Sequence, residues 1–240
     1  MNSRIFSIPN VFTLCNLFAG CLAIVSISKT NYELSLAFIS ASLVFDYLDG
    51  FTARLLNTDN VYGKELDSLS DIVSFGVVPG FIFYKLLMKA WPQTNTVWEY
   101  LPAIAFLITV FAALRLANYN IEEDSKDQFM GLPTPGVTLY AAGIWAIHWS
   151  ERCAWCVQLT GHPIFILLSV VCLSLLMISR IPLFNLRFSN LKWQSNEIRW
   201  TFLAISLLTL ILFSENAPTL LVVIYILLSL FQNWIIKSRI

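Results

Sequence analysis

Four of the five aspartates within a 26-residue stretch of this chain form two pairs, separated by a short polar stretch. Asp46 and Asp49 are three residues apart, and Asp67 and Asp71 are four apart. In a helix, both spacings place the two carboxylates of a pair on one face, about 5–6 Å apart along the axis. Two adjacent helices with such pairs can direct four carboxylates into one small volume.

Carboxylates gathered in this way suit hard divalent cations, which prefer oxygen ligands. Two cations held about 3.5–4 Å apart by bridging carboxylates can clamp the oxygens of a phosphoryl group during transfer. The alternative is that the aspartates only cap helix ends or are solvated. Long apolar segments flank them on both sides, and a charged side chain at mid-membrane costs about 2.5–3.5 kcal/mol. We therefore expect the four side chains to form a functional site.

The residues between the two pairs fit a phosphate-containing ligand. Arg54 can donate two parallel hydrogen bonds to phosphate oxygens. Gly50 and Ala53 lie about one helical turn from the aspartates and leave room for a ligand near the backbone. We expect Gly63, together with the polar stretch 57–60, to form the turn between the two helices.

The composition is that of an integral membrane protein. The 240 residues are 57% hydrophobic and 12% charged, about half the charged share of a soluble domain. Zero net charge gives no electrostatic case for nucleic acid as a partner. We expect an all-α membrane protein with one domain, residues 1–240. The segments that could form spans of about 20 apolar residues are 11–28, 34–56, 66–88, 100–119, 134–150, 163–180, 200–214 and 218–236.

The distribution of Lys and Arg predicts the orientation of these spans. With a cytoplasmic N-terminus, eleven of the fifteen Lys and Arg residues fall on the inner side and four on the outer side. Because such residues are in excess in cytoplasmic loops, we expect both termini and the aspartates to be cytoplasmic, at the inner membrane if the protein is bacterial. The basic, aromatic segment 181–199 is then an inner loop, which we interpret as an amphipathic stretch on the membrane surface.

Three of the five cysteines fall in apolar spans, where they are expected to be small packing residues. Cys153 and Cys156 form a single C-x-x-C near His148 and His162. A zinc or redox site is conceivable there, but one such pair is a weak signal. The sequence leaves the role of this pair open.

The acidic segment resembles the signature of a known family of membrane enzymes, the CDP-alcohol phosphotransferases. All eight positions of that signature are filled by Asp46-x2-Asp49-Gly50-x2-Ala53-Arg54-x8-Gly63-x3-Asp67-x3-Asp71. The resemblance implies a catalytic core of six transmembrane helices, which we match to residues 1–180, with two further helices in residues 181–240. It also implies transfer of a phosphatidyl-type group from a CDP-linked lipid to an alcohol, with release of CMP.

The same resemblance implies roles for individual residues. All four aspartates are expected to bind two divalent cations, Mg²⁺ or Mn²⁺, and Asp71 is also expected to be the general base for the acceptor hydroxyl. Members of the family are commonly homodimers, so we expect a homodimer. The residues implied in binding the nucleotide and its phosphates are Asp49, Gly50, Ala53, Arg54, Gly63 and Asp67.

Segments around the signature resemble one subgroup of this family, the phosphatidylserine synthases. They are Ile8-Pro9-Asn10 with Thr13 and Asn16, the run from Asp71 to Pro79, Arg115-Leu-Ala-Asn118-Tyr119-Asn120, and Phe129 to Pro135. The subgroup implies CDP-diacylglycerol from the lipid bilayer as donor and L-serine as acceptor, giving phosphatidylserine and CMP. The third segment departs from the usual pattern, because Asn118 stands where an arginine is usual.

The expected contact for the serine carboxylate is Arg115, with Ser74, Asn118 and Lys126 as weaker candidates. For Arg115, anchoring at the cytoplasmic face of the membrane is an equally plausible role. Another acceptor, such as glycerol 3-phosphate, an inositol phosphate or choline, stays open. A phosphorylated acceptor favours a basic cluster, and only Arg115 and Lys126 are available in this region. A cation transporter is the alternative from another class, although its carboxylates would be spread through the membrane depth.

Overall fold

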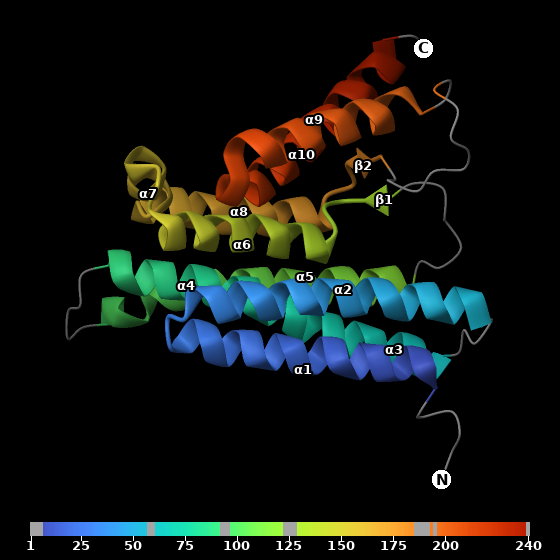
Figure 1. Cartoon of the computed structure of the whole chain (residues 1–240), viewed down its shortest axis with the longest axis horizontal. Coiled ribbons are helices and arrows are strands. Elements are labelled where there is room, and N and C mark those ends of the chain that lie inside the picture. Colours follow the sequence, from blue (N-terminus) through green and yellow to red (C-terminus); the bar gives the residue numbers. More distant parts are fainter. Residues whose placement is uncertain are drawn as a thin grey trace.

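Long apolar helices make up the fold and run roughly side by side along one axis (Figure 1). The structure is a computed structural model that describes residues 7–56, 61–91, 97–121, 129–184, 193 and 196–238. The N-terminal part contains α1 (Ile8–Ser28), α2 (Tyr32–Leu56), α3 (Val61–Asp71), the π-helical segment η1 (Ile72–Val77), α4 (Val78–Ala90), the 3₁₀ segment η2 (Val97–Phe106) and α5 (Leu107–Ile121). The C-terminal part contains β1 (Phe129–Met130), α6 (Thr134–Ser150), α7 (Ala154–Thr160), α8 (Pro163–Ile178), β2 (Pro182–Leu183), α9 (Glu197–Phe213), the 3₁₀ segment η3 (Ser214–Asn216) and α10 (Ala217–Ser238).

The all-α membrane fold predicted from the sequence is confirmed. Five helical stretches in the described part are long and apolar enough to cross a membrane, and α7 with α8, bent by 65°, would make a sixth. Each of the eight predicted spans coincides with helix. However, α6 and α9 have 17 residues each, fewer than the roughly 20 that a perpendicular span needs. The division into six core helices and two additional ones therefore stays a prediction.

Local sequence signals explain where several helices begin. The side chain of Ser7 accepts a hydrogen bond from the backbone N–H of Asn10 and caps α1. A proline occupies one of the first two positions of α1, α6 and α8. Proline suits this place because the first backbone N–H groups of a helix have no partner within the helix.

The helices pack in successive layers (Figure 1). α1 packs along α2 and along α3 and η1, α5 packs on η1 and α8, and α10 covers α6. Close approach of α6 and α10 depends on Gly143, because a Cβ atom there would overlap Thr219. The largest fully buried side chains lie mainly on α4, α5, α6 and α8 and include Phe83, Ile82, Leu87, Ile108, Ile144 and Ile166.

Candidate active site

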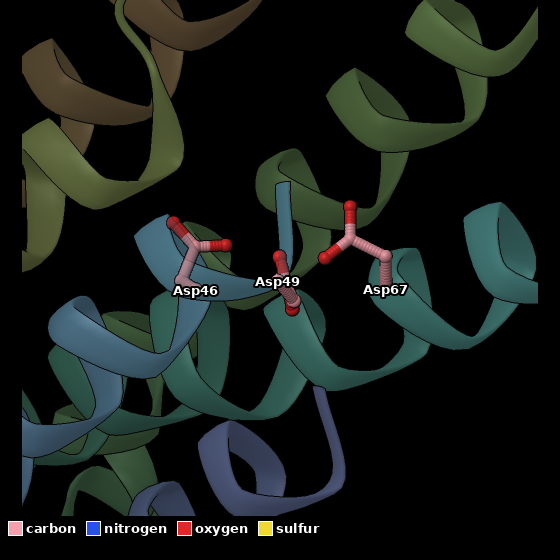
Figure 2. A group of neighbouring side chains, drawn as sticks. All are labelled: Asp46, Asp49 and Asp67. Atoms are coloured by element: carbon pink, nitrogen blue, oxygen red, sulfur yellow. The ribbon is translucent and has the colours of Figure 1, made fainter. Parts of the chain in front are cut away.

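Three aspartates from α2 and α3 converge on one point between the two helices. Asp46, Asp49 and Asp67 each offer one carboxylate oxygen, and these oxygens lie within 4.8 Å of one another. Figure 2 shows Asp46 and Asp49 on α2 next to Asp67 on α3. Helical spacing therefore brings the carboxylates together as the sequence suggested, but in a group of three.

Two oxygens of this group have no hydrogen-bond donor. Asp49 Oδ2 and Asp67 Oδ1 are buried and have no partner among the residues that the structure describes. Asp49 as a whole is only 6% exposed. Burying a carboxylate oxygen without a compensating partner is costly. A divalent cation bound by the three side chains would supply that partner, so the residues present fit a metal site.

Asp71 lies beside the group of three, at the end of α3. It is 8% exposed, and the Asn16 side chain donates a hydrogen bond from Nδ2 to its Oδ1 over 3.4 Å. Its carboxyl neighbours that of Asp46. Asp71 is therefore close enough to act with the other three, while its position is set by a different contact.

A row of polar residues on α1 packs against the two helices that carry the aspartates. Asn10, Thr13 and Asn16 are spaced three residues apart, and all three are buried. The Asn16 side chain links α2 to α3, because its Oδ1 accepts a hydrogen bond from Ser42 and its Nδ2 donates to Asp71. The Thr13 hydroxyl lies next to Asp49.

Neither Thr13 nor Asn16 was among the site residues expected from the sequence. The available signal was a polar residue at every third position of an otherwise apolar helix, a spacing that keeps the residues near one helical face. Such polar groups are buried only when they find partners; Asn16 finds them on the acidic helices, and the Thr13 hydroxyl donates to the Pro9 carbonyl of its own helix at 3.2 Å.

A π-helical segment follows Asp71 directly. The Gly76 carbonyl within it accepts a hydrogen bond from the Thr109 hydroxyl of α5 at 2.9 Å. A Cβ on Gly76 would lie 3.2 Å from that of Ala112, so the two helices approach closely here. π-Helical turns occur often at functional sites, and this one fixes the position of Asp71 relative to α5.

The expected phosphate-binding residues lie on the same two helices. Arg54 is exposed in the last turn of α2, and its guanidinium folds back over Gly50, since a Cβ there would lie 3.5 Å from Nη1. Ala53 is half-buried beside them. Their role in binding phosphate stays a prediction.

One expectation for this region is wrong. Gly63 lies inside α3, which already begins at Val61, and so it does not form the turn. Glycine is tolerated there because the first turn of a helix has few internal hydrogen bonds to lose. The polar stretch 57–60 lies outside the described residues.

Among the candidates for serine binding that the structure describes, Arg115 has an unpaired group within electrostatic range of an aspartate. It is half-buried on α5, within electrostatic range of Asp71, and its buried Nε has no hydrogen-bond partner among the described residues. Ser74 instead donates its hydroxyl to the Asn16 carbonyl at 3.1 Å and packs on Gly20. Asn118 is exposed, and Lys126 lies outside the described residues.

The C-x-x-C pair lies far from the aspartates, at the start of α7 near the opposite end of the helices (Figure 1). Cys153 and Cys156 form a disulfide, so they offer no thiolates to zinc. His148 Nε2 is hydrogen-bonded to the Thr160 hydroxyl at 3.2 Å. The zinc interpretation that the sequence left open therefore has no support.

Sequence comparison identifies the class to which this fold and site belong. The profile of the CDP-alcohol phosphatidyltransferase family matches residues 6–212, and the chain belongs to that family. The match includes all helices that carry the aspartates and Arg115, and it extends through most of α9. The protein is therefore a membrane enzyme of phospholipid biosynthesis, as the resemblance of the acidic signature implied.

Several relatives are named CDP-diacylglycerol–serine O-phosphatidyltransferase. The protein from Helicobacter pylori strain 26695 is 30% identical over 213 residues, which is 88% of this chain and 81% of that relative. The protein from Bacillus subtilis is 30% identical over 174 residues, 72% of this chain and 88% of the relative. The protein from Methanocaldococcus jannaschii is 36% identical over 140 residues, 58% of this chain and 61% of the relative.

Proposed function

We propose that this enzyme transfers the phosphatidyl group of CDP-diacylglycerol to the hydroxyl of L-serine, giving phosphatidylserine and CMP. The observation that carries the proposal is the group formed by Asp46, Asp49 and Asp67, with two buried oxygens that lack donors. This donor set suits a cation-bound diphosphate. The names of the relatives support the choice of donor and acceptor.

In this reaction the serine oxygen forms a bond to the phosphorus of the phosphatidyl group, and the bond from that phosphorus to the CMP oxygen breaks. We assign the hydroxyl proton of serine to Asp71, whose carboxylate is held by Asn16 and is adjacent to Asp46. A general base placed in this way contributes about 10²–10⁴-fold. CMP leaves with the electron pair of the broken bond.

The remaining residues bind and orient. Asp46, Asp49, Asp67 and Asp71 would hold two divalent cations, Mg²⁺ or Mn²⁺, which when bound neutralise the diphosphate charge and polarise the reacting phosphoryl group. Arg54 takes a phosphate oxygen, and Gly50 with Ala53 leaves room for the nucleotide. Arg115 pairs with the serine carboxylate, because its guanidinium is half-buried beside Asp71 and a carboxylate would satisfy its Nε–H, which has no partner among the described residues.

The site is proposed to face the cytoplasm, where serine is available. The start of α1 and the end of α10 lie at the same end of the bundle as the aspartates, and α7 lies at the other (Figure 1). A disulfide at Cys153 and Cys156 is typical of an oxidising compartment, which supports the orientation expected from Lys and Arg. The homodimer expected from the resemblance stays a prediction.

Purified protein supplied with CDP-diacylglycerol, Mg²⁺ or Mn²⁺ and a panel of alcohols tests the proposal. We expect CMP release that depends on serine, with phosphatidylserine as the lipid product. If CMP is released only with glycerol 3-phosphate, an inositol phosphate or choline, that compound is the acceptor and serine is not. Ion flux through the protein in vesicles, with no CMP release under any condition, would favour a transporter instead.

A further inference from the structure

Two serines fix the backbone of α1 to the segment that carries Asp71, and α1 lies beside that segment along its length (Figure 1). Ser70, one residue before Asp71, donates its hydroxyl to the Thr13 carbonyl at 3.1 Å. Ser74, three residues after Asp71, donates its hydroxyl to the Asn16 carbonyl, also at 3.1 Å. Both serines are buried. The main chain of Asn16 is therefore held in a fixed position next to Asp71.

The side chain of Asn16 bridges α2 and α3 away from solvent, since Asn16 is 0% exposed. Its Oδ1 accepts a hydrogen bond from the Ser42 hydroxyl of α2, and its Nδ2 donates to Asp71 Oδ1 at 3.4 Å. Contacts to catalytic groups are often long before substrate binds and tighten afterwards. Asn16 therefore connects the helix that carries Asp46 and Asp49 to the carboxylate of Asp71.

The orientation of the Asn16 amide decides which group Asp71 meets. A side-chain amide has a carbonyl oxygen that only accepts hydrogen bonds and an NH₂ group that only donates them. An ionised carboxylate only accepts, so Asp71 needs the NH₂ side of the amide. The amide carbonyl then faces α2, where it needs a donor because it is buried. The Ser42 hydroxyl, on a residue that is 2% exposed, is that donor.

We propose that Ser42 and Asn16 form a positioning pair for Asp71, in which Ser42 sets the orientation of the Asn16 amide and the amide binds one oxygen of Asp71. The other oxygen of Asp71, Oδ2, is then left to face the acceptor hydroxyl. The inference rests on the proposed function, in which Asp71 receives the proton of serine. It gives Ser42, which lies one helical turn before Asp46 on α2, a part in the transfer step that it plays through Asn16.

The variant Ser42→Ala tests the pair, because it removes the hydroxyl and adds no bulk. Without its donor, the Asn16 carbonyl is buried and unpaired, and the amide loses the contact that turns its NH₂ group toward Asp71. We expect kcat to fall about tenfold, the effect of about one hydrogen bond. The KM for serine and the KM for CDP-diacylglycerol should each change by less than about twofold, because the residues proposed to bind these substrates are unchanged.

The matched control is Ser35→Ala, on the same helix about two turns before Ser42. Ser35 is also buried and also bonds a side chain of another helix, since it accepts from the Trp145 indole N–H at 2.7 Å. Both variants should lower the melting temperature, and only Ser42→Ala should lower kcat. An equal fall of kcat in the two variants would show that any loss of buried pairing on α2 slows the enzyme, and this result would overturn the proposal.

Double variants show whether Ser42 acts through the amide and the base. In an Asn16→Leu background, which already lacks the amide, adding Ser42→Ala should lower kcat no further, and the same should hold in an Asp71→Asn background. Losses of kcat that simply multiply in these backgrounds would contradict the inference.

The double variant of Ser42→Ala with Asn16→Leu also decides the question if Ser42→Ala alone does not fold. Replacing both partners of a buried hydrogen bond by apolar groups leaves neither of them unpaired and costs less stability than replacing one. In the folded double variant, a kcat about tenfold or more below that of the unmodified enzyme supports the inference. A kcat within about twofold of the unmodified enzyme contradicts it.

The outcomes also separate this inference from the proposed function. An unchanged kcat in Ser42→Ala, with serine-dependent CMP release intact in the unmodified enzyme, would overturn the inference alone. A rise in the cation concentration needed for half-maximal activity, as large as that in Asp67→Asn, would make the pair a support of the cation site and would also overturn it. No serine-dependent release by the unmodified enzyme would overturn the proposed function.

Discussion

The two ends of the helical bundle bury polar groups in opposite ways. At the end near α7, the buried His148 is bonded to Thr160 and the Trp145 indole N–H donates to Ser35 at 2.7 Å. At the other end, Asp49 Oδ2 and Asp67 Oδ1 are buried without donors. Since native proteins pair almost all buried polar groups, the unpaired end is the one built to receive a ligand.

The charge of the unpaired groups strengthens this comparison. Two serine hydroxyls, on Ser174 and Ser206, also lack partners among the described residues. A neutral hydroxyl costs far less to bury than a charged group. Within the described ranges, the buried unpaired groups that carry charge are on Asp49, Asp67 and Arg115, and they lie around Asp71. The buried polar groups near α7 are therefore paired with one another within the fold. The charged groups around Asp71 are left unpaired and can bind substrate and cations.

Removal of divalent cations should give the largest effect. A chelator is expected to abolish CMP release, and added Mg²⁺ or Mn²⁺ should restore it, because the converging carboxylates repel one another when no cation is bound. Asp67→Asn should require a higher cation concentration for half-maximal activity. Glu65→Gln, which changes an exposed carboxylate on the same helix, is the control. Full activity in the presence of the chelator would show that the aspartates do not serve to bind a cation, and the contrast between the two ends would be lost.

Asp71→Asn should lower kcat by about 10²–10⁴-fold, the contribution of a positioned general base. The amide retains the size of the carboxyl, so CDP-diacylglycerol should still bind with nearly the same affinity in an equilibrium binding measurement. Near-normal turnover of this variant would remove Asp71 from its role as base. Loss of lipid-nucleotide binding to the same extent as turnover would make Asp71 a ligand only.

Arg115→Ala should raise the KM for serine by about 100-fold, because truncating one partner of a hydrogen-bonded charge pair removed from water costs roughly 2–5 kcal/mol, and Arg115 Nε is buried. Arg152→Ala, in the loop at the α7 end, is the matched control and should leave the serine KM unchanged. A small change in serine KM with Arg115→Ala would assign this arginine to anchoring at the membrane face.

The sequence predicted much of this arrangement because its strongest signals were local. Helical spacing and the length of apolar segments depend on residues close in the chain, so the helices and the grouping of Asp46, Asp49 and Asp67 could be anticipated. The partner of Asp71 could not, since Asn16 lies 55 residues away. The π-helical segment and the pairing of β1 with β2 depend on packing between distant parts of the chain, which no local pattern encodes. Gly63 was misplaced because a glycine after a polar stretch is also a common turn signal.

Removing the disulfide should give the smallest effect on activity. In the double variant with Cys153→Ser and Cys156→Ser, we expect kcat and both KM values within about twofold of the unmodified enzyme, since α7 is remote from the aspartates. The melting temperature should fall, because closing so short a loop stabilises the fold by about 2 kcal/mol in the chain-entropy account. A thiol reagent that cannot cross membranes should label these cysteines in reduced intact cells if α7 is external. A large loss of activity, or labelling only after the membrane is opened, would show that the two ends are coupled or that the orientation is reversed.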